Sequence, residues 1–187
     1  HLSSLIEVLA LMEFEMKRSN ILVLAISAGL VFAFATATAV GAEKGKKADK
    51  TQAAITYPAA TRVAPEQKGV AALDKLRNQM ITAHQKNKDS DALVNAEKIL
   101  LDSKANNYDK AIANQIKMIT AAKKEPDNHK ALIPLLEEII ELNALDNNTH
   151  YDFMSQLAQR YLIEQDYEDA LATADTFLKE TNAPTET

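Results

Sequence analysis

The sequence predicts an all-α protein made of stacked helical hairpins, and three observations lead to this expectation. The 187 residues include 4 Gly, 5 Pro and no Trp, which leaves little material for a turn-rich β architecture. From residue 69 onward, apolar side chains recur at helical spacing between short polar breaks. The apolar pattern also returns with a period of 39 residues, which is typical of repeated supersecondary units.

The N-terminal part has the layout of a bacterial secretory signal. Met16-Lys17-Arg18 precedes an apolar run over residues 21–40, and small residues close it before Ala42. This order predicts a signal peptide over residues 16–42, whose cleavage releases the protein into the periplasm with no membrane attachment. Residues 1–15 precede the expected start and are interpreted as a non-native upstream extension. The alternative is an inner-membrane anchor through residues 21–40, because this run is long enough to span a bilayer.

A linker is expected between the signal and the helices. Residues 43–68 are charged or small and show no periodicity, as in Glu43-Lys44-Gly45-Lys46-Lys47. Such a composition buries too little apolar surface to order the chain. We therefore expect a disordered linker over this range.

Six helices are expected in the domain that follows, over residues 69–187. They span residues 70–87, 90–103, 108–124, 128–143, 148–164 and 167–181. In pairs they form hairpin repeats at about 70–107, 108–146 and 147–184. The second helices align without gaps at Ala92-Leu93, Ala131-Leu132 and Ala170-Leu171. No polar capping helix follows the last unit, so we expect either a truncated repeat array or a last face covered by a partner.

The last unit resembles a tetratricopeptide repeat over residues 151–181. With Tyr151 as its first position, the residues that carry the resemblance are Met154, Leu157, Ala158, Tyr161, Ala170, Ala174 and Phe177-Leu178. The first two units depart from the pattern, since Met80 and Ile119 stand where a small residue is expected. The resemblance implies a right-handed solenoid of three diverged repeats. Its implied packing residues are Ala92, Ala131, Leu157, Ala158, Tyr161, Ala170, Ala174 and Phe177.

The same resemblance implies a groove, lined by the first helix of each unit, that binds a peptide or a partner protein. By position, the first unit would present Arg77, Ile81 and His84. The second would present Ile116, Thr120, Lys123 and Lys124. The third would present Asp152, Ser155, Gln159, Leu162 and Ile163.

The residues that carry chemistry do not form a recognisable site. The chain has no Cys, and His84, His129 and His150 lack the spacing of a metal pair on a helix. A Gly-rich phosphate loop and a nucleophile elbow are also missing from the sequence. We therefore expect neither an enzyme nor a bound cofactor or metal. A glycan-handling protein would need carboxylates that converge in a cleft.

Charge divides the chain into a basic and an acidic part. Residues 43–124 carry 16 Lys and Arg against 9 Asp and Glu, whereas residues 125–187 carry 3 against 14. The basic part has only Tyr57 and Tyr108 as aromatic residues, so nucleic-acid binding is not expected. Such a polarised chain can steer a charged partner or pair with copies of itself.

Two functions follow from these observations. The first is a periplasmic scaffold that binds a peptide or a partner protein through a helical-repeat groove, for example during assembly of envelope complexes. The alternative is a self-associating structural protein of the cell envelope, in which the acidic face of one copy meets the basic helices of another.

Overall fold

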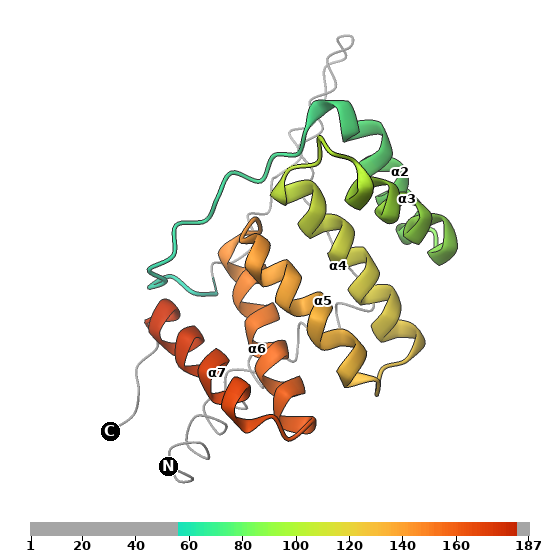
Figure 1. Ribbon diagram of the computed structural model, residues 1–187. Coiled ribbons are helices and arrows are strands. Elements are labelled where there is room, and N and C mark those ends of the chain that lie inside the picture. Colours follow the sequence, from blue (N-terminus) through green and yellow to red (C-terminus); the bar gives the residue numbers. More distant parts are fainter. Residues whose placement is uncertain (1–55, 183–187) are drawn as a thin grey trace, which may run out of the picture. The chain divides into compact units, whose positions relative to one another are not determined.

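The polar breaks of the sequence separate six α-helices, which follow one short 3₁₀ turn. The elements are η1 (Ala71–Leu73), α2 (Asp74–Gln85), α3 (Asp89–Leu101), α4 (Asn107–Lys124), α5 (His129–Leu142), α6 (Asn147–Ile163) and α7 (Tyr167–Thr181). The computed structural model describes residues 56–182, and this range contains no strand. Each helix packs against the next one along the chain, and α2 also packs against α4 (Figure 1). The prediction of an all-α protein made of helical hairpins is confirmed.

Several expectations concern residues outside the described range. These are the upstream extension (1–15), the signal peptide (16–42) and the first part of the linker (43–55). Within the described range, no helix is both long and apolar enough to cross a bilayer.

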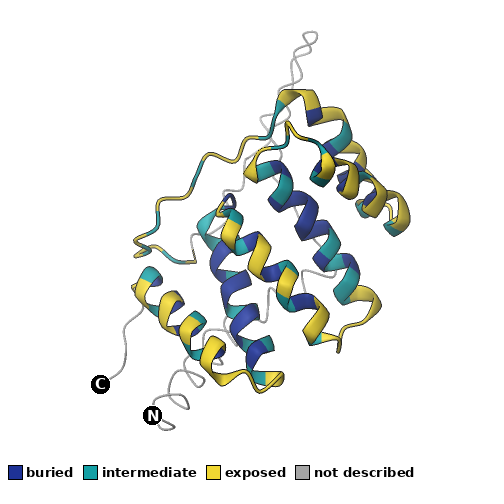
Figure 2. Ribbon diagram, viewed as in Figure 1, coloured by how far each residue is buried: buried dark blue, intermediate teal, exposed yellow. Residues whose placement is uncertain are grey.

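The second helix of each hairpin buries side chains at the same spacing, i, i+4 and i+7. The buried residues are Ala92, Ala96 and Ile99 in α3, Leu132, Leu136 and Ile139 in α5, and Ala170, Ala174 and Phe177 in α7. This spacing places the three side chains of each helix on one face. Figure 2 shows that α4 and α6 are the helices buried along most of their length.

The first and third hairpins turn with the same backbone hydrogen bonds. The N–H of Lys88 donates to the carbonyl of Ala83 (2.9 Å), and the N–H of Asp166 donates to the carbonyl of Tyr161 (2.8 Å). Each turn also contains one residue with positive φ, Asn87 at 54° in the first and Gln165 at 65° in the third. Residues 78 apart, which is twice the expected period, are therefore structurally equivalent in these two hairpins.

The middle hairpin departs from this pattern. Its turn comprises residues 125–128, one residue more than the turns at 86–88 and 164–166. The extra residue shifts α5, so Leu132 is buried where Ala92 and Ala170 lie in the other hairpins, while Ala131 is exposed. The gapless alignment is thus wrong at Ala131. The other seven expected packing residues are buried: Ala92, Leu157, Ala158, Tyr161, Ala170, Ala174 and Phe177.

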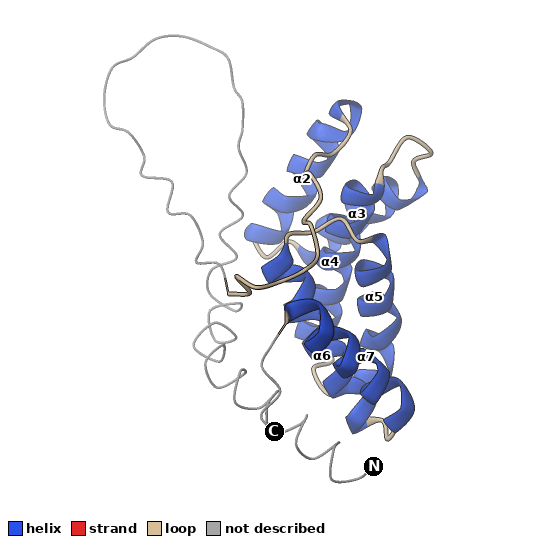
Figure 3. Cartoon of the chain, turned by 90° about the vertical axis from the view of Figure 1, so that its left-hand side faces the viewer, coloured by secondary structure: helices blue, strands red, loops and turns tan. Residues whose placement is uncertain are grey.

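Residues 56–70 form an extended strap that leads into η1 and α2 (the long tan segment in Figure 3). Near its start, the ring of Tyr57 packs edge-on against Tyr151 (centroids 5.1 Å apart) and Phe177 (5.7 Å). The N–H of Thr61 then donates to the carbonyl of Glu180 (2.8 Å) at the end of α7. The expectation of a disordered linker is therefore wrong for residues 56–68, because distant helix ends supply the contacts that order them.

Arg62 fixes the middle of the strap. Its guanidinium donates to the side-chain oxygen of Asn143 (2.7 Å), that of Asn147 (2.6 Å) and the carbonyl of Leu145 (2.9 Å). The side chain of Asn147 donates back to the carbonyl of Arg62 (3.0 Å). These bonds tie the strap to the α5–α6 connection.

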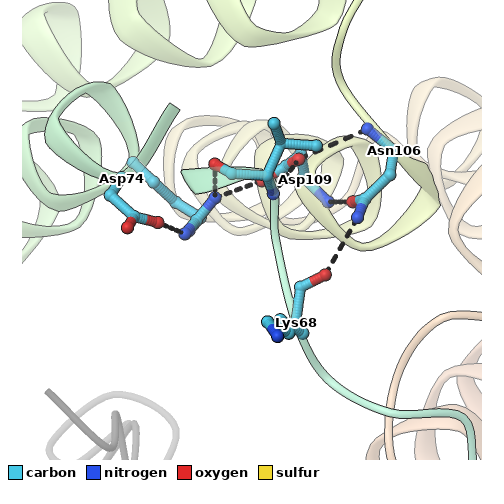
Figure 4. A network of polar contacts seen from close by, with 6 residues as sticks. Lys68, Asp74, Asn106 and Asp109 are labelled. Carbon is cyan, nitrogen blue, oxygen red and sulfur yellow. Dashed lines mark hydrogen bonds and ion pairs between the residues drawn. The ribbon is translucent and has the colours of Figure 1, made fainter. Parts of the chain in front are cut away.

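The end of the strap joins a polar network at the start of α4 (Figure 4). Asn106 and Asp109 form a capping box, and the amide of Asn106 donates to the carbonyl of Lys68 (2.9 Å). The N–H of Val70 donates to the carboxylate of Asp109 (2.9 Å), which is also paired with Arg77 of α2. One carboxylate thus joins the strap, α2 and α4.

Candidate functional site

Four of the twelve residues expected in the groove face the protein interior. Arg77, Ile81, Ile116 and Thr120 are buried, and Arg77 is paired with Asp109 and Asp74. A partner cannot reach these side chains in this conformation. The expectation that they line an open groove is therefore wrong.

The remaining candidates from the first two units lie near the α2–α3 turn and the end of α4. The ammonium of Lys123 contacts the carboxylate of Asp89 (2.8 Å) and the side-chain oxygen of Asn87 (3.3 Å). His84 is half-buried, and this desolvation lowers its pKa, although Asp89 opposes the shift. Lys124 is exposed. Lys123 is thus engaged within the chain, where it stabilises the first turn.

The candidates on α6 differ in how accessible they are. Asp152 accepts a hydrogen bond from the hydroxyl of Tyr57 (3.3 Å), and burial raises its pKa to about 6. The amide of Gln159 donates to the hydroxyl of Ser155 (3.3 Å), and both residues are half-buried. Leu162 is half-buried and Ile163 is 56% exposed. The structure therefore does not unite the twelve residues in one groove.

A different surface, on the first hairpin, forms a hollow. It has a volume of ≈ 900 Å³ and runs between α2 and α3. We call it the α2–α3 groove. Its lining residues are Lys75, Asn78, Gln79, Thr82, Ala83, Lys86, Lys88, Asp91, Val94, Asn95 and Lys98. None of these residues was among the groove candidates taken from the sequence.

The α2–α3 groove is basic. Four lysines line it together with a single carboxylate, that of Asp91. None of the four forms an ion pair with a described residue, whereas Lys117 and Lys123 of α4 do. Val94, which is 54% exposed, adds an apolar contact among them. A cluster of unpaired cations beside an apolar side chain favours an acidic, partly apolar ligand.

The turns of the first and third hairpins are equivalent, so the α2–α3 groove can be compared with the same surface of the third hairpin. At an offset of 78 residues, Lys75, Gln79 and Ala83 of α2 correspond to Phe153, Leu157 and Tyr161 of α6. The α6 residues are buried, and the hydroxyl of Tyr161 contacts Glu137 of α5. The third hairpin thus uses these positions to pack against the hairpin before it. In the first hairpin two of these positions carry the exposed polar side chains of Lys75 and Gln79, while Ala83 is buried at the base of the groove.

A second, smaller hollow of ≈ 370 Å³ lies beneath the strap, between Arg62 and the ends of α5, α6 and α7. His150 lines it, and burial lowers the pKa of this residue to about 4, which keeps its ring neutral at pH 7. The guanidinium of Arg62 already donates to three oxygens of the chain. Arg62 therefore holds the strap in place, and its guanidinium is not free to bind a ligand in this hollow.

Neither a metal-binding cluster nor a known relative adds to this description. Among residues 56–182, no three His, Asp or Glu side chains lie close enough together to hold a metal ion. Comparison of the chain with models of protein families, with curated proteins and with solved structures gives no match. The α2–α3 groove thus stands as the candidate site on its geometry and charge.

Proposed function

We propose that this chain is a protein-docking scaffold whose α2–α3 groove takes an acidic segment of a partner protein. The proposal includes a solenoid of tetratricopeptide-like hairpins and no catalytic activity. It also includes export to the periplasm, which the N-terminal sequence motif supports.

The observation that carries the proposal is the free stacking position of the first hairpin. The equivalent residues of the third hairpin, Phe153, Leu157 and Tyr161, are buried, and the hydroxyl of Tyr161 contacts Glu137 of α5. The first hairpin instead presents the polar side chains of Lys75 and Gln79, so it is shaped for hairpin packing but soluble when free. A polar surface with a shape suited to helix packing favours a partner that binds reversibly.

The lining residues define the chemistry of the partner. Lys86 and Lys88 lie at one end of the groove and Lys75 and Lys98 at the other, because the two helices run antiparallel. Asn78, Gln79 and Asn95 between them can donate to and accept from a peptide backbone. An acidic segment with one apolar side chain against Val94 would satisfy both features.

Crosslinking in living cells tests this function. A photo-reactive residue at Val94 should capture a partner in the envelope, because this side chain projects among the four lysines. Reversal of two charges, Lys86→Glu with Lys98→Glu, should abolish the adduct. The matched control is Lys130→Glu, which reverses an exposed charge at the start of α5, away from the groove. The proposal fails if no adduct forms, or if the same adduct persists in the reversed variant.

The proposed location has its own test. Cell fractionation with intact-mass measurement should find the protein in the periplasm, beginning at Glu43 after removal of residues 16–42. Recovery in the inner membrane with residues 21–40 retained would instead support the anchored alternative.

A further inference from the structure

The second helix of each hairpin repeats a second pattern, one position beyond its buried residues. The pattern is apolar, acidic, apolar at i, i+4 and i+7. Its members are Leu93, Glu97 and Leu100 in α3, Ile133, Glu137 and Ile140 in α5, and Leu171, Asp175 and Leu178 in α7. The gapless alignment missed it, because offsets of 40 and then 38 residues are needed to superimpose the three sets.

In the first two hairpins the acid of this face contacts the next hairpin, as does Ile140 in the second, although Leu93 is 37% exposed. The carboxylate of Glu97 pairs with Lys117 of α4 (3.6 Å), and that of Glu137 accepts from Tyr161 of α6. Ile140 packs against the cluster of Tyr151, Met154 and Phe177 in the third hairpin. The repeated acid is thus the polar contact between successive hairpins.

In the last hairpin the same face carries no further hairpin among the described residues. Asp175 is exposed and forms no ion pair or hydrogen bond with any described residue, while Leu171 is half-buried. Leu178 is partly covered, since it packs against the Tyr151 cluster. We call Leu171, Asp175 and Leu178 the α7 face.

The α7 face and the α2–α3 groove are equivalent in position to the two sides of the contact between α5 and α6. The α7 face corresponds to the surface that α5 presents to α6, and the groove corresponds to the surface that α6 presents to α5. Their charges are also opposite. Residues 164–180 carry six Asp and Glu against a single Lys, whereas four lysines and one Asp line the groove.

We propose that the occupant of the α2–α3 groove is the α7 face of a second copy of this chain. Copies then stack head to tail, so that Asp175 of one copy meets the lysines of the next and Leu171 lies beside Val94. Such a contact joins two different surfaces, so it extends into a filament or closes into a ring. This inference rests on the proposed docking function of the groove and names its partner.

Two variants test the contact, one by blocking the α7 face and the other by blocking the α2–α3 groove. Asp175→Lys removes the acid of the α7 face, and Lys75→Glu with Lys86→Glu reverses the groove. Light scattering after size exclusion, on the chain as cells produce it, should show salt-sensitive oligomers for the wild type. Each blocked variant should associate more weakly by about tenfold or more, because like charges then face each other. Lys130→Glu should assemble like the wild type, and circular dichroism should show that all variants fold.

Mixing the blocked variants gives the sharper readout. Each variant is blocked on its own, but the reversed α7 face of one is complementary to the reversed groove of the other, so an equimolar mixture should regain assembly with the two variants alternating. Placing all three substitutions in one chain should restore assembly, because both halves are then reversed. A wild type that stays monomeric at every concentration overturns the inference, as does a mixture that stays monomeric. If the wild type is monomeric but the Val94 crosslinker captures another protein, the docking function stands and only the choice of partner fails.

Discussion

Asp109, at the start of α4, forms a buried ion pair with Arg77 of α2. The Asp109 side chain is 0% exposed and that of Arg77 is 10% exposed. The same carboxylate also accepts from the N–H of Val70, at the end of the strap. A buried charge that loses its partner is strongly destabilising, because its desolvation is then uncompensated.

We expect Asp109→Asn to lower the free energy of unfolding by up to about 3–5 kcal/mol, because it leaves the buried Arg77 guanidinium with the half-exposed Asp74 as its remaining charged partner. The comparison is Asp74→Asn, which removes the other carboxylate on Arg77. Asp74 is 56% exposed, so its loss should cost no more than about 1 kcal/mol. Urea denaturation measures both, and equal effects would show that the Asp109 pair is not buried as described.

Gly69 lies against this ion pair. A Cβ at this position would collide with the Arg77 guanidinium and the carboxylate of Asp109. Gly69→Ala should therefore displace the end of the strap and cost about 1–3 kcal/mol, in the range of other overpacked sites. Hydrogen exchange at Val70 should rise with it. Ala64→Ser, at an exposed position of the strap, is the control and should leave both quantities unchanged.

The register of the second helices can be tested with three Ala→Leu substitutions. Ala158 and Ala170 are buried, so a larger side chain at either site should overpack the third hairpin and cost about 1–3 kcal/mol. Ala131 is exposed, and Ala131→Leu should change the melting temperature little. An effect of Ala131→Leu as large as that of Ala170→Leu would favour the gapless alignment over the shifted α5.

Asp152 should make stability depend on pH. Burial raises its pKa to about 6, although the hydrogen bond from Tyr57 opposes the shift, and in an unfolded chain the pKa is about 4. Between these values the folded state binds more protons, so this group favours folding more as the pH falls from 6 toward 4 and less as it rises.

Asp152→Asn should thus melt at a higher temperature than the wild type above pH 6, where the wild-type carboxylate is charged. The difference should vanish below pH 4, where both side chains are neutral. Because His150 is present in both proteins, its own titration cancels in the comparison. Thermal melts from pH 4 to 8 measure the difference, and a constant offset across this range would contradict the assignment.

Local signals account for the parts of the structure that the sequence predicts well. The helix from Tyr167 to Thr181 follows from its apolar spacing, and Ala170, Ala174 and Phe177 are buried as a single stripe. Helical periodicity is set by residues within a few turns, so it can be recognised in the sequence without knowledge of the neighbouring helices. The six helices, their hairpin order and the core of the third unit were predictable for this reason.

Other features depend on contacts between residues distant in sequence. Tyr57 lies 94 positions before Tyr151, and Arg62 lies 81 before Asn143, so no local pattern indicates that the strap is ordered. The groove candidates failed for a related reason. Arg77 and Thr120 occupy expected groove positions, but the packing of α2 and α4 against their neighbours buries both.

The sequence by itself determined the all-α class, the hairpin order and the opposite charges of the two halves, because these depend on composition and on local spacing. Only the tertiary structure decided which faces are open. One extra residue in the α4–α5 turn moves Leu132 into the position expected of Ala131, and a shift of one residue turns a helix by about 100°. That rotation, invisible in a gapless alignment, is what places Glu97, Glu137 and Asp175 at equivalent positions of their helices.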